Sequence, residues 1–242
     1  MSGVRFPLHV NDPILVLLDI DGTLLDAAGQ GREAFHEALD SFYPGRTFPL
    51  VSMAGRTDRG LWEQFTALVP QDPPSFDAFL ERYVAILDRR LGGHPPLALP
   101  GAQALVHALE TEPDFHPGLV TGNIEEGSRL KLHHCGLWEV FERTGLKPAA
   151  FGDVDPDKGP LADKALAQWG SPARAIVVGD TPEDIRCAHL AGIPCLAVVH
   201  GHFSEAQLRD AGADAIVPNL SDTPRVLGLI RELARHPQET AS

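Results

Sequence analysis

The sequence has 242 residues, of which 43% are hydrophobic and 22% charged, the profile of an ordinary globular protein. This length can bury a substantial core and suits one domain with an inserted module. The formal net charge is −13, and no basic stripe is present, so we expect no nucleic-acid partner. No apolar run has transmembrane length, and residues Met1–Asp12 lack the pattern of a secretory signal, so we expect no membrane association.

The cysteines indicate a reducing environment. Cys135, Cys187 and Cys195 form neither a CxxC pair nor a disulfide framework. We therefore expect buried thiols, a cytoplasmic protein and no zinc site.

Short apolar runs alternate with helical patterns along most of the chain. This alternation predicts the α/β class, with a Rossmann-like doubly wound parallel sheet and helices on both of its faces. The expected strands are Ile14–Leu18, Gly118–Val120, Ala175–Val178, Pro194–Val199 and Ala215–Val217, and the expected helices are Gly101–Thr111, Glu125–Cys135, Pro160–Trp169, Pro182–Ala191 and Ser204–Ala211.

Residues 27–99 break this rhythm because they contain no clear strand. Amphipathic patterns predict helices over Arg32–Phe42, Asp58–Val69 and Phe76–Leu91. We therefore predict a catalytic core of residues 1–26 and 100–242, with a helical cap of residues 27–99 inserted after the first strand. Inserted modules beside an active edge commonly act as lids.

Two carboxylates follow the first expected strand directly. Asp19 and Asp21 are two residues apart, so on an extended chain they point the same way. Gly22 and Thr23 then turn the chain at the carboxyl end of the strand, the edge where open α/β sheets bind ligands. One carboxylate is suited to attack an electrophile or hold a cation, and the other to move a proton.

Other strand ends deliver polar residues to the same edge. Thr121 and Asn123 follow the second expected strand, and Asp180 and Asp184 follow the third, while Lys158 lies in a loop before a helix. Clustered carboxylates repel one another unless a cation is present, and oxygen ligands favour Mg²⁺.

A phosphoryl group fits this set of residues. Mg²⁺ and Lys158 would hold it beside Asp19, and Thr121 and the backbone amides after Asp21 would donate to its oxygens. The candidate substrate-binding residues are Gly22, Thr23, Gly122, Asn123 and Arg56.

Three segments make the chain resemble the haloacid dehalogenase-like hydrolase superfamily, particularly its phosphoglycolate-phosphatase-like members with a helical C1 cap. Asp19–Leu25 is similar to the first family motif, Leu119–Asn123 to the second and Val178–Asp184 to the fourth. The resemblance spans nearly the whole chain, and motifs in this order and at this spacing are far more specific than a lone DxD.

The resemblance implies a role for each matching residue. Asp19 would be the nucleophile and form an aspartyl-phosphate, and Asp21 would protonate the leaving alkoxide and then deprotonate water. Thr121 would bind a phosphoryl oxygen. Asp180 would share Mg²⁺ with Asp19 and the carbonyl of Asp21, and Asp184 would be a further ligand or orient a metal-bound water.

Two positions leave alternatives open. The third motif departs from the family pattern: Lys158 stands at about the right distance after Phe151–Asp153, whereas Lys147 carries the more literal Lys-Pro pair but comes before that segment. In the cap, Arg56 either reaches a substrate carboxylate or phosphate, or simply precedes a helix that Thr57 or Asp58 caps.

The function that the resemblance implies is hydrolysis of a small phosphorylated metabolite by a monomer or homodimer, with 2-phosphoglycolate as the preferred substrate. Asp21 disfavours the dehalogenase and P-type ATPase branches, and the absence of lysine from residues 27–99 disfavours phosphonate cleavage. A sugar-phosphate phosphatase, a β-phosphoglucomutase-type phosphomutase and a catalytically silent binding or regulatory module are the alternatives.

Overall fold

The computed structural model describes residues 13–49, 51–69, 72–170 and 174–235. The expectation about a secretory signal in Met1–Asp12 lies outside these residues. Among the described helices, none combines the length and the apolar character that crossing a membrane requires.

The described strands form one parallel sheet of six strands and one antiparallel pair. The sheet order is β5-β4-β1-β6-β7-β8, so β1 lies in the interior with β4 and β6 as its neighbours. The chain builds outward from β1 on one side and then crosses to the other, which is the doubly wound arrangement. The bounds are Ile14–Leu18 for β1, Phe115–Val120 for β4, Ala149–Ala150 for β5, Ala175–Gly179 for β6, Cys195–Val198 for β7 and Ala215–Val217 for β8.

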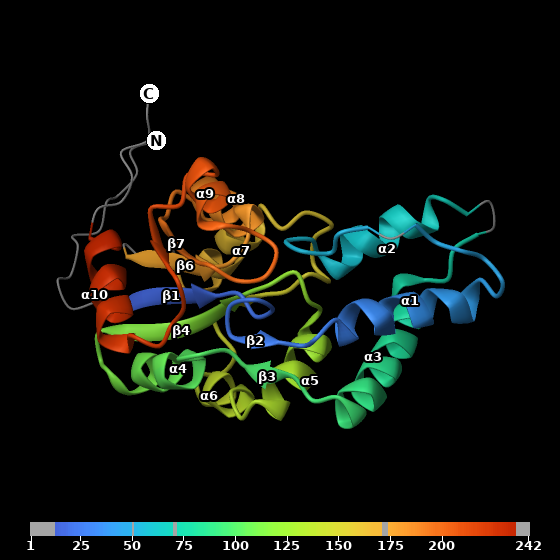
Figure 1. The fold of residues 1–242 in the computed structure, drawn as a ribbon, viewed down its shortest axis with the longest axis horizontal. Helices are drawn as coiled ribbons and strands as arrows, with labels where there is room; N and C mark the ends of the chain where they lie inside the picture. Colours follow the sequence, from blue (N-terminus) through green and yellow to red (C-terminus); the bar gives the residue numbers. More distant parts are fainter. Residues whose placement is uncertain (1–12, 50, 70–71, 171–173, 236–242) are drawn as a thin grey trace.

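Helices cover both faces of this sheet (Figure 1). Alternate residues of β1 explain why: Val16 and Leu18 pack in one hydrophobic cluster, and Leu15 and Leu17 pack in the other. The first cluster includes residues of α4 (Ala102–Thr111), α5 (Glu125–His134), α6 (Trp138–Arg143) and α10 (Thr223–Leu233), and the second includes residues of α7 (Leu161–Gln168), α8 (Pro182–Leu190) and α9 (Glu205–Asp210).

Three helices lie beside this layered core, at the right of Figure 1: α1 (Gln30–Phe42), α2 (Asp58–Thr66) and α3 (Phe76–Gly93). We refer to residues 27–99 as the cap. Its helices share a separate hydrophobic cluster, in which Phe35 makes ring contacts with Phe65, Phe79 and Tyr83. Burial of these aromatic rings helps to hold the three helices together.

The sequence pattern suggested that the cap contains no strand, but the structure has one at its end. Strand β3 (Leu97–Ala98) pairs antiparallel with β2 (Leu25–Asp26), so the segment entering the cap lies against the segment leaving it. Two-residue strands carry no periodic signal, and this pairing joins positions far apart in the sequence.

Candidate active site

The site begins at the carboxyl end of β1, where Asp19 is 5% exposed. Its backbone N–H donates to the carbonyl oxygen of Val178 in the neighbouring strand β6 at 2.9 Å. This bond continues the β1–β6 pairing for one residue beyond the strand. The backbone position of Asp19 is therefore fixed by the sheet.

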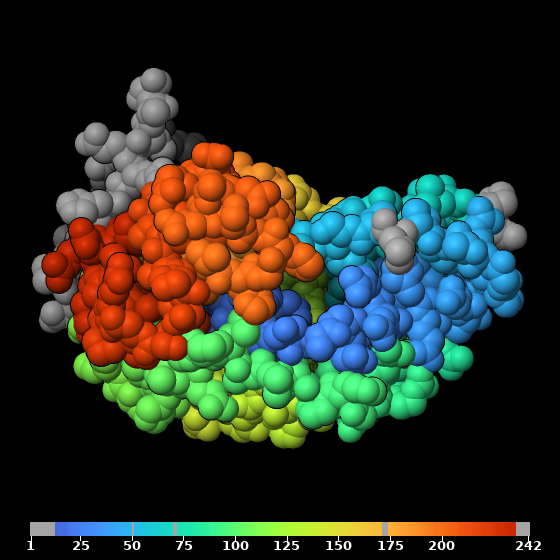
Figure 2. Space-filling model, in the orientation of Figure 1, coloured from blue at the N-terminus to red at the C-terminus, as the bar shows by residue number. Residues whose placement is uncertain are grey.

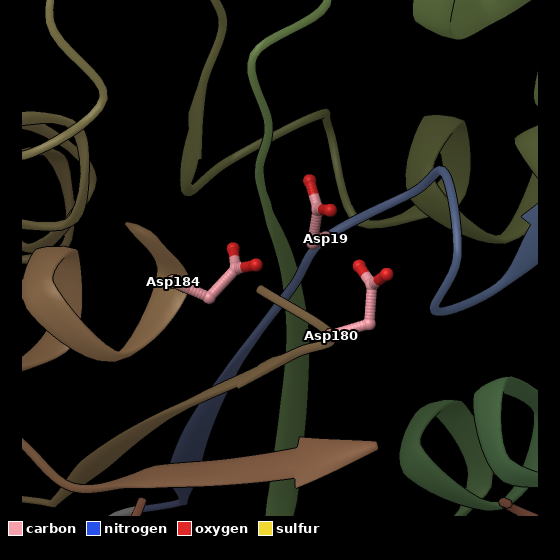
Figure 3. A group of neighbouring side chains, drawn as sticks. All are labelled: Asp19, Asp180 and Asp184. Carbon is pink, nitrogen blue, oxygen red and sulfur yellow. The ribbon is translucent and has the colours of Figure 1, made fainter. Parts of the chain in front are cut away.

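Asp180 and Asp184 bring two further buried carboxylates to Asp19 (Figure 3). Asp180 directly follows β6, and Asp184 lies in the first turn of α8. One oxygen from each of the three side chains falls within 4.8 Å of the others. This spacing is small enough for a single ion to contact all three groups.

The start of α8 fixes Asp184. Its Oδ2 accepts from the backbone N–H of Thr181 at 3.0 Å and from the Thr181 hydroxyl at 2.6 Å, while the Thr181 hydroxyl caps the helix. Gly179 makes room for it, because a Cβ there would lie 2.2 Å from the carboxyl carbon of Asp184.

Lys158 brings a cation into this cluster. Its Nζ lies 3.0 Å from Oδ1 of Asp19 and 2.7 Å from Oδ1 of Asp184, and the residue is 3% exposed. Lys147, the alternative from the sequence, is exposed, and its backbone carbonyl lies 2.9 Å from the ring of His116. The structure therefore places Lys158, and not Lys147, at the carboxylates.

The three buried carboxylates carry more negative charge than Lys158 can neutralise. Burial, reinforced by repulsion from Asp184 and Asp19, raises the pKa of Asp180 from 3.8 to about 9. Burial also raises the pKa of Asp19 to about 6, although the attraction of Lys158 opposes it. Burial disfavours the charged form of Lys158, but Asp184 and Asp19 outweigh it and raise its pKa. One ammonium therefore does not neutralise three carboxylates, and oxygen-only donors in this arrangement fit a hard divalent cation.

Asp21 faces a different set of partners. Its Oδ2 accepts from Asn123 Nδ2 and from Lys131 Nζ, each at 2.7 Å. Asn123 Nδ2 also lies 2.9 Å from the hydroxyl oxygen of Thr121, which accepts from the backbone N–H of Asn123 as well, at 3.3 Å. Since Thr121 Oγ1 accepts from Asn123, its own proton is available to a ligand.

The turn after Asp21 differs from the sequence expectation. The Gly22 N–H donates to the carbonyl of Leu25 at 2.9 Å, and the Thr23 N–H donates to that of Ile20 at 3.3 Å. These two amides are therefore engaged inside the turn, because the tight bend requires internal hydrogen bonds. Thr23 is fully buried, and its hydroxyl lies 3.5 Å from Asp180 Oδ1. Thr23 thus contacts Asp180 from within the protein interior and does not line the cavity.

A cavity of about 500 Å³ opens between this sheet edge and the cap. In Figure 2 the surface is hollowed where the orange loop after β7 faces the blue and cyan segments. The lining residues from the core include Asp19, Asp21, Gly22, Thr121, Gly122, Asn123, Lys158 and Asp180, and those from the cap include Arg56, Asp58 and Tyr83.

The start of α2 joins the cap to this edge. The side chain of Thr57 accepts from the Gly60 N–H and caps the helix, while the exposed Arg56 lines the cavity. The backbone N–H of Asp58 donates to the carbonyl of Gly122 at 2.8 Å. Gly122 must lack a side chain, because a Cβ would lie 2.0 Å from the carbonyl oxygen of Arg56.

Two residues at the site were not anticipated from the sequence. Lys131 is 3% exposed although it is a lysine. Its spacing of three and four residues from Ser128 and Gly127 places all three on one face of α5, which the structure shows to be buried. Asp58 is buried, and its carboxylate accepts from the backbone N–H of Ile124 at 3.0 Å instead of capping its own helix. No local pattern distinguishes this arrangement from a helix cap.

Comparison with known proteins shows which family the chain is similar to. The family described as haloacid dehalogenase-like hydrolase matches residues 16–198. A phosphoglycolate phosphatase from Cupriavidus necator is 28% identical over 88% of this chain and 92% of its own length. The pyrophosphatase PpaX from Halalkalibacterium halodurans is 25% identical over 88% of this chain and 96% of its own length.

Solved structures share the fold. A hydrolase from Pseudomonas syringae superposes with a TM-score of 0.68 at 21% identity, covering 90% of this chain and 99% of that one. The predicted α/β fold, the resemblance and the enzyme class of phosphatase are confirmed by these matches. The chain therefore belongs to the haloacid dehalogenase-like hydrolase family.

Proposed function

We propose that this protein is a Mg²⁺-dependent phosphomonoester hydrolase that works through an aspartyl-phosphate on Asp19. The observation that carries the proposal is the convergence of Asp19, Asp180 and Asp184, with oxygens within 4.8 Å of one another, beside the buried ammonium of Lys158. A carboxylate nucleophile needs such positive charge so that it can approach an anionic phosphoryl group.

Asp19, Asp180 and the backbone carbonyl of Asp21 would hold the ion. When bound, the ion would supply charge that offsets the negative charge of the phosphoryl oxygens. Asp184 would act through Lys158 and Thr181, because its Oδ1 pairs with the first and its Oδ2 accepts from the second.

The reaction would take two steps. An Asp19 oxygen attacks phosphorus while the bond to the leaving oxygen breaks, and Asp21 gives that oxygen a proton. Water then attacks the phosphorus of the acyl-phosphate, Asp21 takes a proton from the water, and Asp19 is released. Thr121, whose hydroxyl proton is free, would donate to a phosphoryl oxygen, and Lys158 would orient Asp19.

The substrate would be a small phosphorylated metabolite, because the cavity of about 500 Å³ lies beneath the cap. A two-carbon phosphorylated acid such as 2-phosphoglycolate is our first choice, since the matching relative from Cupriavidus necator is a phosphoglycolate phosphatase. Arg56, at the cap side of the cavity, would pair with a second anionic group on the substrate. The three cysteines are buried and free, in keeping with a cytoplasmic enzyme.

The experiment that tests this proposal measures release of nitrophenolate from p-nitrophenyl phosphate, with Mg²⁺ and with EDTA. We expect turnover in Mg²⁺ only, and a loss of at least about 10³-fold in Asp19→Asn. Asp163→Asn, which changes an exposed aspartate on α7, is the matched control and should retain full activity. Equal rates in wild type and Asp19→Asn would eliminate the nucleophile.

A second assay identifies the substrate. The purified enzyme is offered 2-phosphoglycolate, pyrophosphate and a set of sugar phosphates, and the substrates are ranked by kcat/KM. We expect 2-phosphoglycolate to lead. A higher value for pyrophosphate would place the chain closer in activity to the second relative.

A further inference from the structure

The side chain of Asp21 is held in a closed triangle of hydrogen bonds. Lys131 Nζ lies 2.7 Å from Asp21 Oδ2 and 2.6 Å from Asn123 Oδ1, and Asn123 Nδ2 lies 2.7 Å from the same Asp21 oxygen. Two donors therefore meet on Oδ2. Among the described residues none hydrogen-bonds to Oδ1, which is the oxygen left to exchange a proton.

The cap closes over the ammonium of Lys131. Gly31, on α1, lies close to it: a Cβ there would lie 3.2 Å from Lys131 Nζ and 3.8 Å from the hydroxyl of Tyr83 on α3. The buried carboxylate of Asp58 lies near enough for Lys131 to lower its pKa against the effect of burial. The lysine is thus enclosed by side chains of both core and cap, and it is 3% exposed.

Burying an ammonium is costly unless its partners compensate for the lost water. The Lys131 ammonium donates to Asp21 and Asn123, and both of these residues line the cavity. Both bonds end on side chains that line the cavity, so this burial fixes the orientation of Asp21 at the cavity.

We infer that Lys131 is a positioning residue for proton transfer, one that fixes the carboxyl group of Asp21 toward the leaving oxygen. The inference rests on the proposed function, in which Asp21 gives a proton to the leaving alkoxide and then takes one from water. Both transfers use the same carboxyl group, so a side chain held by Lys131 and Asn123 presents one oxygen in the same place in each step. Misplacement of a reacting group by about 1 Å can cost on the order of 100-fold in rate.

The test compares two esters of nearly the same shape, phenyl phosphate and p-nitrophenyl phosphate. Nitrophenolate departs readily without a proton, whereas phenolate is far more basic and needs the acid. We expect Lys131→Met to lower kcat/KM for phenyl phosphate about 30-fold and for p-nitrophenyl phosphate no more than about threefold, with KM nearly unchanged. A change in overall folding would lower both values equally, and equal losses would overturn the inference.

A double-mutant cycle isolates the partner. In an Asp21→Asn background the acid is already absent, so adding Lys131→Met should cost less than about twofold further with phenyl phosphate. If the loss from Lys131→Met persists in full in that background, Lys131 acts on the substrate or the fold and not through Asp21.

Lys164→Met is the matched control, because Lys164 also pairs with an aspartate, Asp155 at 2.6 Å, but on the surface and away from the cavity. It should leave both esters unaffected. If circular dichroism shows that Lys131→Met does not fold, Lys131→Gln replaces it, since glutamine is uncharged but can still donate a hydrogen bond. This variant should lose less kcat/KM than Lys131→Met, and its loss should again be larger for phenyl phosphate than for p-nitrophenyl phosphate. Equal losses for the two esters in Lys131→Gln would overturn the inference.

The two proposals fail separately. If wild type with Mg²⁺ hydrolyses neither ester, the proposed function and this inference fall together. If wild type is active and Asp19→Asn is not, while Lys131→Met behaves like Lys164→Met, the inference about Lys131 alone is overturned.

Discussion

Gly22 leaves the space that the carboxylate of Asp180 occupies. A Cβ on Gly22 would lie 2.2 Å from Oδ2 and 2.5 Å from the carboxyl carbon of Asp180. Gly22 also has φ of 81°, a left-handed conformation that a side chain disfavours. The turn after β1 and the end of β6 therefore depend on each other, although they lie far apart in the sequence.

Substituting Gly22→Ala should displace Asp180 and abolish Mg²⁺-dependent hydrolysis. Gly45→Ala is the matched control, because Gly45 has φ of 78° but no atom of the described residues within 4 Å of an added Cβ. Both variants should lose about 1 kcal/mol of stability from backbone strain, measured by urea unfolding. Only Gly22→Ala should also lose phosphatase activity, and retention of activity there would contradict the proposed role of Asp180.

Lys158→Met should destabilise the protein by about 3–5 kcal/mol, because removing one partner of a buried ion pair leaves the others uncompensated. The carboxylates affected are those of Asp19 and Asp184, which both contact Lys158. Urea unfolding without metal measures the effect. Lys164→Met, which breaks a partly exposed pair, should change stability by less than about 1 kcal/mol. Similar losses of stability in the two variants would argue against a buried ion-pair cluster around Lys158.

Asp180→Asn should weaken the stabilisation of the protein by Mg²⁺. Burial and neighbouring carboxylates raise the pKa of Asp180 to about 9, so its ionisation opposes folding at pH 7 without metal. The neutral variant should then be at least as stable as wild type. With Mg²⁺ at about 100 times its Kd, wild type should gain about 2.7 kcal/mol of stability, and the variant should gain clearly less. Thermal unfolding with and without MgCl₂ measures both, and an equal shift in the two proteins would exclude Asp180 as a ligand.

Asp58→Asn should stabilise the protein at pH 8 but not at pH 4. Burial raises the pKa of Asp58 from 3.8 to about 6 against the attraction of Lys131, while Asp21 and Asp153 raise it further. Between these two values the folded protein binds more protons than the unfolded chain, so the unfolding free energy falls as pH rises. A pKa difference of two units corresponds to a fall of roughly 3 kcal/mol in the unfolding free energy over this pH range.

The asparagine variant lacks this titration and can still accept from the Ile124 N–H. The difference in unfolding free energy between this variant and wild type, measured with urea, should therefore grow from pH 4 to pH 6 and stay constant above that. Asp163→Asn, at an exposed position, should show no such growth. An advantage that is the same at every pH would mean that Asp58 does not titrate in this window.

Much of the sheet could be predicted because its strands carry their signal locally. Continuous apolar runs at Ile14–Leu18 and Ala175–Val178 match β1 and most of β6, since a strand buried on both faces has no polar positions. Helix α6 was missed because six residues are too few to show a period, and α10 was not recognised despite its buried Val226, Leu227 and Ile230. The β2–β3 pair could not be seen, because its pairing is entirely long-range.

The sequence by itself determined the family, the fold class and the sheet edge where Asp19, Asp21, Thr121 and Asp180 would gather, because each follows a strand whose direction the alternation of strands and helices specifies. Only the tertiary structure decided that Lys158 and not Lys147 meets Asp19, that Lys131 holds Asp21 and that Asp58 docks the cap on the Ile124 amide. These contacts join segments far apart in the chain, and their distances follow from how the helices pack on the sheet and on one another, which no local pattern of residues encodes.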